Sequence, residues 1–428
     1  MERWKKIEKV PAPAFTSVFG PLTGMRVLCN GTINAAPFAA TMLSDFGAEV
    51  IQIERPNIGD PGRFQAPKIV HGDKAISAVF LQNGRNRLSL TLNTNLKYPE
   101  SKEIFLSLIK NADVWIENMV WIEKMGITDE MLLEVNHKLI ICHVSGFGRP
   151  QFGGDPEICD KPSYDPIGQA ESGFMFLNGF AEPQPVLQTA GFINDYITAM
   201  FAAFGIVSAY VNAQNTGKGQ VIDVTQIEAG ARILDDNFAA WINAGWLKKR
   251  YGNKVPVFQP ANTYKTKDGK YGLVGAYGRD VYERCLKSMN IDIEEFPYLE
   301  AGASADAVNS PLGQELERRV EAFVTSHDSQ FLYENFNKYK VPFATARNAQ
   351  EIYKDPHWHG RNNFIKYVDQ TLGKEIEAFG IAPKMSDTPG QVWRGAPALG
   401  QDTETILSRL LGYSDKEIAA FKGKGIID

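Results

Sequence analysis

The chain lacks long apolar runs and any regular cysteine pattern. No stretch of about 18 consecutive apolar residues occurs, so we expect no transmembrane helix. Residues 1–6 include basic side chains, but no apolar segment follows them, so we expect no secretory signal. The four cysteines, Cys29, Cys142, Cys159 and Cys285, show no CxxC spacing. This predicts reduced thiols and a cytoplasmic location, rather than disulfides or a zinc site.

An excess of charge of one sign is also missing. The 45 basic and 50 acidic residues are interspersed and give a net charge of -5, which argues against nucleic acid or a membrane surface as a partner. His357 and His359 lie close in sequence, but no Cys or His cluster joins them, so we expect no metal. The 428 residues, 44% of them hydrophobic, are enough for a large core and for two or three domains.

Three common nucleotide-binding and catalytic motifs are absent. Residues 30–36 follow an expected strand and contain one glycine, whereas a dinucleotide site needs G-x-G-x-x-G. Glu54 is therefore interpreted as a strand-end charge rather than a ribose ligand. Neither a G-x-S-x-G nor a Walker sequence occurs, so an α/β-hydrolase or a P-loop enzyme is not supported.

What the sequence does contain is alternating strand and helix patterns. Residues 25–29 form a short apolar run, Pro37 suits the first turn of a helix, and residues 49–54 form a second run. Such a βαβ unit is typical of a parallel α/β sheet. The pattern continues with expected helices at 99–112 and 196–212, and with expected strands at 114–116, 139–142 and 221–224.

The alternating pattern of strands and helices changes after about residue 235. Residues 264–271 predict a β-hairpin with an Asp-Gly turn, and residues 278–340 are mostly helical. Strands, loops and a last helix at 403–411 follow. We therefore expect a large domain from residues 1–225 and 350–428, and a small domain with its linkers from 226–349.

One loop stands out, around Asp165. An Asp followed by Pro is usually a turn or a helix cap, but a buried carboxylate can also be a covalent nucleophile. Such a nucleophile needs donors aimed at the developing oxyanion, and the glycines of residues 145–148 are candidates for them. These residues alone do not choose between the two interpretations.

Several segments match a known family in chain order. They are FGPLTGMRV at 19–27, APFA at 36–39, GAEVI at 47–51, SGFG at 145–148, SYD at 163–165, TGKGQ at 216–220 and WRGAP at 393–397. Together they resemble the class III coenzyme A transferases, the CaiB/BaiF family, and most of all its carnitine and bile-acid members. The resemblance covers nearly the whole chain. It implies a Rossmann-like parallel-sheet domain, a smaller α+β domain and an interlocked homodimer.

The resemblance also implies a mechanism and a set of site residues. Asp165 would attack an acyl-CoA thioester, carry the acyl group as a mixed anhydride and then carry CoA as a thioester, before an acceptor acid reverses the sequence. Coenzyme A would be a substrate, with no permanent cofactor. The positions that match CoA contacts are Asn34, Ala35, Arg55, Asn118, Lys124 and Met200. Arg85 and Arg87 are further candidates, with solvated surface charge as the alternative.

Two other functions stay open. Racemases of the same family use a His-Asp pair in this loop, but here Tyr164 precedes Asp165, and tyrosine is a poor base. A CoA-binding protein without turnover is the other alternative. The acceptor implied by the resemblance is a carnitine-like, crotonobetaine-like or bile-acid-like carboxylate. The aromatic residues Tyr164, Phe174, Phe176 and Trp241 are either acyl-pocket candidates or core residues.

Overall fold

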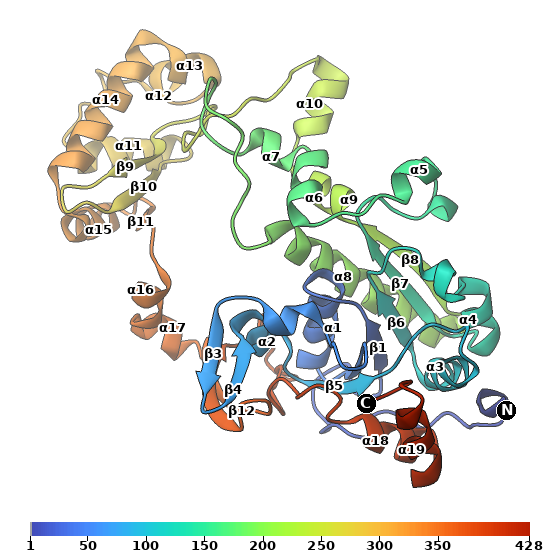
Figure 1. Cartoon of the computed structure of the whole chain (residues 1–428). Coiled ribbons are helices and arrows are strands. Elements are labelled where there is room, and N and C mark those ends of the chain that lie inside the picture. Colours follow the sequence, from blue (N-terminus) through green and yellow to red (C-terminus); the bar gives the residue numbers. More distant parts are fainter. Residues whose placement is uncertain (1) are drawn as a thin grey trace. The chain divides into compact units, whose positions relative to one another are not determined.

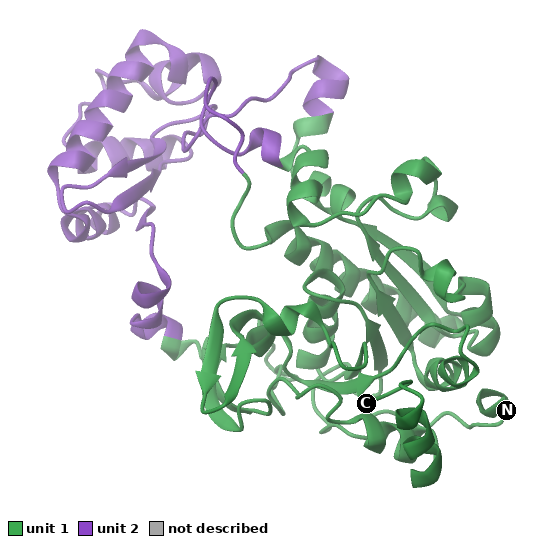
Figure 2. Ribbon diagram, in the orientation of Figure 1, with its two compact units in different colours: residues 1–174, 188–238, 359–428 green, residues 175–187, 239–358 purple. Residues whose placement is uncertain are grey.

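The computed structural model describes residues 2–428, which form two compact units (Figure 2). The large unit contains the chain up to residue 174, residues 188–238 and residues 359–428. The small unit contains residues 175–187 and 239–358. Both chain ends therefore belong to the large unit. The sequence did not separate the short segment 175–187 from the large domain.

A six-stranded parallel sheet forms the centre of the large unit, in the order β5-β2-β1-β6-β7-β8 (Figure 1). Its strands are β1 (Arg26–Asn30), β2 (Glu49–Glu54), β5 (Arg87–Thr91), β6 (Val114–Glu117), β7 (Ile140–Ser145) and β8 (Gln220–Thr225). The first five strands are almost wholly buried, which explains why most of them are apolar runs. The expected parallel α/β sheet is confirmed. Strand β5 was not predicted, because its polar residues resembled a turn.

Helices cover both faces of this sheet. They are α1 (Ala35–Asp45) and α8 (Ile193–Thr216) on one face, and α3 (Pro99–Asn111) and α4 (Asp129–Val135) on the other. One core joins α1 and α8 to side chains such as Val27, and the other joins α3 and α4 to side chains such as Trp115. Side chains of neighbouring strand residues point to opposite faces, so each strand contributes to both cores.

Helix α8 is also long and apolar enough to cross a membrane by length and composition. In its most apolar window, 44% is buried inside the protein, and its buried face packs against α1. The end of α8 agrees with the sequence, because Gly217 follows it with φ of 72°.

The C-terminal segment differs from its prediction of a single helix at 403–411. The structure has a short α18 (Thr403–Thr405), a π-helical turn (Ile406–Leu410) and a separate α19 (Asp415–Gly423). Helix α19 was not predicted. Ser414 begins it with a capping box to Glu417, a signal that the sequence contains.

The remaining elements of the large unit surround the sheet. They are β3 (Lys68–His71), β4 (Lys74–Ser77), α2 (Ala78–Asn83), α5 (Pro156–Cys159), α6 (Asp165–Glu171), α9 (Gln226–Arg232), β12 (Phe364–Asp369) and β13 (Lys374–Phe379). Strands β3–β4 and β12–β13 form two antiparallel hairpins. The chain passes between the units at four points, and three of these lie in the helices α7 (Phe174–Leu177), α10 (Asn237–Ala244) and α17 (Pro356–Gly360).

The small unit is an α+β structure with its own core. Its elements are β9 (Ala261–Lys265), β10 (Tyr271–Gly275), α11 (Arg279–Ser288), α12 (Tyr298–Ala301), α13 (Ala305–Asn309), α14 (Pro311–Ser326), α15 (Ser329–Lys338), β11 (Phe343–Thr345) and α16 (Ala349–Tyr353). The predicted hairpin is confirmed: Lys265 pairs with Tyr271, and Gly269 turns the chain with φ of 86°.

A buried ion pair ties the N-terminal segment to the sheet of the large unit. Arg26 Nε donates to Glu49 Oε1 at 2.7 Å, and both side chains are fully buried. Glu49 Oε2 also accepts the backbone N–H groups of Ala14 and Phe15, at 2.6 and 2.7 Å. The carboxylate is therefore saturated with donors, as a buried charge requires.

Replacing this carboxylate should destabilise the protein strongly. We expect Glu49→Ala to lower the free energy of unfolding by about 3–5 kcal/mol, because it leaves a buried guanidinium without its partner. The matched control is Glu404→Ala, which breaks an exposed pair with Lys422 and should cost less than about 1 kcal/mol. Urea unfolding followed by circular dichroism measures both. Equal effects would contradict a structural role for the buried pair.

Candidate active site

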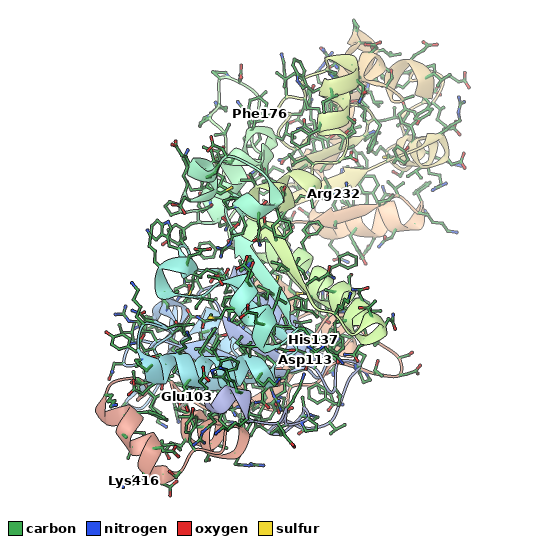
Figure 3. All side chains as sticks on the ribbon, turned by 90° about the vertical axis from the view of Figure 1, so that its right-hand side faces the viewer. Glu103, Asp113, His137, Phe176, Arg232 and Lys416 are labelled. Atoms are coloured by element: carbon green, nitrogen blue, oxygen red, sulfur yellow. The ribbon has the colours of Figure 1, made fainter. Side chains whose placement is uncertain are left out.

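The candidate nucleophile lies at the carboxyl end of the parallel sheet. In Figure 3, the labelled Asp113 and His137 lie just before the first residues of β6 and β7, at the amino end of the sheet. The labelled Arg232 ends α9, which follows β8 at the carboxyl end of the sheet. In open α/β sheets ligands bind at this carboxyl edge. Asp165 is the first residue of α6, so it is not a simple turn residue, and only 2% of its surface is exposed.

Two neutral donors hold the carboxylate of Asp165. Gln169, one helical turn later, donates from Nε2 to Oδ1 at 2.5 Å. The backbone N–H of Asp195, near the start of α8, donates to Oδ2 at 3.0 Å. The amide of Gln169 is itself oriented, because its Oε1 accepts the N–H of Thr189 at 2.8 Å. Within residues 2–428, the carboxylate is thus fixed in position without an ion pair.

A second carboxyl group, the side chain of Asp195, lies beside Asp165. Asp195 Oδ1 accepts from Gln226 Nε2 at 2.6 Å, and Gln226 Oε1 accepts from the hydroxyl of Ser163 at 2.6 Å. Burial, together with the charge of Asp165, raises the pKa of Asp195 to about 6, although contacts with Gln226 and Asn34 oppose the shift. The sequence analysis did not identify Asp195 or Gln226, since nothing in their local pattern marks them.

Helix α6 packs closely against the two helices that carry these groups. A Cβ atom on Gly168 would lie 2.2 Å from Asn194 Nδ2 and 2.8 Å from Gln226 Cβ. Asn194 is itself buried and donates to the backbone oxygen of Gln226 at 3.1 Å. The absence of a side chain at Gly168 therefore sets the distance between Asp165 and its partners on α8 and α9.

A cavity of about 530 Å³ adjoins this network. Residues 32–35, 118–121, 148–150 and 159–164 line it, together with Asp195 and other residues. This range includes Tyr164, next to the nucleophile, which is 69% exposed. The cavity therefore gives a ligand access to the surroundings of Asp165.

A second cavity, of about 750 Å³, shares Thr32 and Met119 with the first. It follows the ends of β1 and β2 and includes residues 53–60 and 92–95. Exposed Arg55 lines it. The two cavities therefore adjoin each other at Thr32 and Met119.

A buried charge network supports the wall of the first cavity. His143 Nδ1 lies 2.6 Å from Glu117 Oε1, and its Nε2 lies 3.0 Å from Asp129 Oδ1. Burial alone would lower the pKa of His143, but the two carboxylates raise it to about 9, so the ring is protonated. Arg149, which lines the cavity, pairs with Glu117 at 2.7 Å and with Glu123 at 2.8 Å. The sequence analysis did not identify this network.

Three of the residues expected to contact CoA lie together at the first cavity. Asn34, just before α1, and Ala35, the first residue of α1, line it, and both are buried. Asn118 joins this turn to the chain after β6, because its amide exchanges two hydrogen bonds with the backbone of Thr32, at 2.8 and 2.9 Å. Lys124 is exposed, with Nζ 4.2 Å from the centre of the Trp121 ring.

Three other expected contacts lie elsewhere. Met200 is half exposed on α8 and lines neither of these cavities. Arg85 is buried and pairs with Asp45 at 2.6 Å. Arg87 is buried too, and its guanidinium donates to the backbone oxygen of Asn83 at 2.6 Å and to other groups of the large unit. The donors of both arginines therefore serve the fold.

The four aromatic acyl-pocket candidates are divided between the two units. Tyr164 lines the first cavity, and Phe174 is half buried in the large unit. Phe176 and Trp241 belong to the small unit. The aromatic residue that sequence reasoning missed is Trp121, which lines the cavity in a left-handed conformation with φ of 63°. Such a conformation in a bulky residue is strained and typical of functional loops.

Comparison with known proteins defines the class. The model of "CoA-transferase family III" matches residues 22–403, and this chain belongs to that family. The bile acid CoA-transferase BaiK of Clostridium scindens is 35% identical over 412 residues, which cover 95% of this chain and 90% of that protein. The succinyl-CoA–D-citramalate CoA-transferase of Chloroflexus aurantiacus is 32% identical over 413 residues, 95% of this chain and 98% of that protein.

The fold of this chain is likewise similar to that of a solved structure from the same family. The crystal structure of a CaiB/BaiF family protein from Brucella suis superposes with a TM-score of 0.78 at 26% identity, covering 92% of this chain and all of that one. The family resemblance inferred from short segments is thereby confirmed. The protein is an enzyme of the class III CoA-transferases.

The close approach at Gly168 can be tested directly. We expect Gly168→Ala to push α6 away from α8 and α9 and to lower kcat roughly 10- to 100-fold, since small displacements of reacting groups are costly. The control is Gly205→Ala in α8, whose Cβ would meet Ile222 at an ordinary 3.4 Å. That variant should keep its activity and gain up to about 1 kcal/mol of stability. Similar kinetics for both variants would contradict the packing argument.

Proposed function

We propose that this enzyme transfers CoA from an acyl-CoA donor to a carboxylic acid, with Asp165 as the covalent carrier. Asp165 attacks the thioester carbon and becomes a mixed anhydride, as CoA leaves as its thiolate. The thiolate then attacks the aspartyl carbonyl, which releases the donor's acid as a carboxylate and leaves an enzyme-bound CoA thioester. The acceptor carboxylate reverses these steps. The single observation that carries this proposal is the buried carboxylate of Asp165, which neutral donors hold at the edge of a cavity.

The neutral donors suit this chemistry. A guanidinium bound to Asp165 would stabilise its charge and weaken it as a nucleophile, whereas amide donors orient the oxygens and leave the charge in place. The same donors, from Gln169 and the backbone of Asp195, stay close to the oxygens of the acylated side chain. Covalent storage in a buried site also protects the anhydride from water.

The two adjoining cavities suit coenzyme A as the shared substrate. We place the thioester end in the first cavity, near Asn34, Ala35 and Asn118. The nucleotide end would occupy the second cavity, where Arg55 is a phosphate ligand of suitable charge. Lys124 is a further phosphate candidate near the junction. The donors of Arg85 and Arg87 are committed to the fold, so they are not part of this proposal.

The acceptor that we favour is a bile-acid-like carboxylate. A carnitine-like acceptor carries a quaternary ammonium group, which aromatic faces bind well. Trp121 lines the first cavity, and Lys124, which does not line it, covers a face of this ring with Nζ 4.2 Å from the ring centre. This reduces the room for another cation on the ring. The 35% identity to a bile acid CoA-transferase supports the same choice.

The alternatives have less support. A racemase needs a free base near the substrate carbon. Tyr164 precedes the nucleophile, and His143 is buried and held between two carboxylates. A binding protein without turnover does not need the ordered donors around Asp165.

The carrier role of Asp165 is tested by trapping the intermediate. Wild-type protein mixed with bile-acyl-CoA and hydroxylamine should carry a hydroxamate at Asp165, detected by intact mass and peptide mapping. Asp165→Asn should carry none and lose at least about 10⁴-fold in kcat, because the nucleophile is gone. CoA binding by calorimetry should remain.

Two results would oppose this function. Solvent deuterium appearing in the acyl-CoA without any adduct would favour the racemase. An active Asp165→Asn enzyme would exclude Asp165 as the carrier. Glu171→Gln, at the exposed end of the same helix, is the matched control and should behave as the wild type.

A homodimer is part of the same proposal. Helix α8 exposes Met200, Phe204 and Val211, which share one face with partly buried Val207 at helical spacing. An exposed apolar stripe of this kind is typical of an interface.

The free cysteines, three of them buried, are consistent with a cytoplasmic location.

The proposed dimer interface on α8 can be tested by introducing a charged residue into it. We expect Phe204→Asp, a residue 73% exposed, to convert a species of twice the 47.5 kDa chain mass to a monomer, because a carboxylate resists burial between apolar faces. Light scattering after gel filtration measures the mass. Val70→Asp, on β3 at an apolar residue that is 63% exposed, is a control for added charge away from this face. A dimeric Phe204→Asp protein would place the interface elsewhere.

A further inference from the structure

The nucleophile has a second carboxyl group as its neighbour, and the mechanism described above gives that group no role. Asp195 supplies a backbone N–H to Asp165, while its own side chain lines the first cavity. The side chain is 9% exposed and accepts a hydrogen bond from Gln226 at 2.6 Å. Asp195 is therefore closer to an incoming substrate than a purely structural residue needs to be.

The surroundings of Asp195 contain one other charge. Helix α6 presents Asp165, α9 presents the neutral amide of Gln226, and the turn before α1 presents the neutral amide of Asn34. Among residues 2–428, neither carboxyl group forms an ion pair with a Lys or Arg side chain. Two cations line the cavity: Arg149, which is already paired with Glu117 and Glu123, and Lys161, which among residues 2–428 is paired with neither Asp165 nor Asp195.

Two adjacent carboxylates without a cation are poorly suited to the proposed reaction. Attack by Asp165 on a thioester places negative charge on the carbonyl oxygen, and the acceptor brings a further carboxylate to the same place. An ionised Asp195 would repel both. A protonated Asp195 would instead offer a hydrogen-bond donor where the charge develops.

We propose that Asp195 works in its carboxylic-acid form, as a catalytic hydrogen-bond donor to the oxygen of the acyl group being transferred. The inference rests on the proposed carrier role of Asp165. When the Asp165 oxygen bonds to the thioester carbon, the carbonyl oxygen gains charge and Asp195 donates to it. The C–S bond then breaks, and the electron pair leaves with the CoA sulfur. The proton stays on Asp195 throughout, so each step balances without another acid.

The surroundings of Asp195 make its protonated form accessible. Burial and the charge of Asp165 raise the pKa of Asp195 to about 6. A bound acyl-CoA would exclude water from the cavity and favour the neutral form further. Activity should therefore be highest on the acid side and fall as the pH rises above the pKa that applies in the complex.

The experiment compares wild type, Asp195→Asn and Asp195→Ala from pH 5 to 8.5. The readouts are kcat and the rate of hydroxamate formation at Asp165 with bile-acyl-CoA. We expect the wild-type rate to fall with a slope approaching tenfold per pH unit at the alkaline end. Asparagine keeps a neutral donor, so Asp195→Asn should show no such fall and exceed wild type at pH 8.5. Alanine has no donor, so Asp195→Ala should lose roughly 100-fold or more at every pH.

A stability readout checks the protonation independently. A carboxyl group whose pKa is raised on folding contributes stability below its unfolded pKa, and that contribution is lost as the pH rises through about 6. The melting temperature of the wild type should therefore decrease relative to that of Asp195→Asn between pH 5 and 8. All variants keep the backbone N–H that holds Asp165.

The outcomes separate this inference from the proposed function. Adducts at Asp165 in the wild type, with the same pH profile in Asp195→Asn, would overturn the role of Asp195 alone. So would an Asp195→Asn enzyme as inactive as Asp195→Ala, because it would mean that the ionised carboxylate is required. A wild-type enzyme that forms no adduct with any of a broad panel of donors would overturn the carrier role of Asp165, and with it this inference.

Discussion

The site depends on holding a buried carboxylate in place without neutralising it. Burial of an unpaired charge is costly, and four buried acids of the described chain, Asp45, Glu49, Glu54 and Glu117, are each paired with a guanidinium, as Glu49 is with Arg26. Asp165 has only the amide of Gln169 and one backbone N–H. The remaining cost is carried by the packing of the fold, which is how strained or poorly compensated groups persist at functional sites.

That packing is a convergence of three helices at the edge of the sheet. Helix α6 carries the nucleophile, α8 and α9 carry its neighbours, and Gly168 allows them to approach. The charge on the other side of the cavity is fixed by different means, since His143 is protonated between two carboxylates. One wall of the cavity is thus electrostatically satisfied, and the other retains Asp195, whose pKa is raised by burial and by the charge of Asp165.

Much of the large-unit fold could be predicted because it is encoded locally. Strands buried on both faces read as short apolar runs, and the glycine or proline that bounds a helix is visible in sequence, as at Pro37 and Gly217. Strand β5 was not predicted in this way, because it begins with Arg87. In the sequence, the buried guanidinium of Arg87 resembles a surface charge until its partners are known. The choice of Asp165 as the candidate nucleophile came from family resemblance, since local pattern alone allowed an ordinary cap.

The sequence by itself determined the α/β class, the main strands and helices of the sheet, the hairpin of the small unit and, through resemblance, the family and Asp165. Only the tertiary structure decided which polar residues surround that carboxylate. Asp195 is 30 residues from Asp165 in sequence, and Gln226 is 31 residues beyond Asp195. Their contacts, and the acidity of Asp195, arise from burial and from distances between helices. Such quantities belong to the packed chain, and no local pattern of residues encodes them.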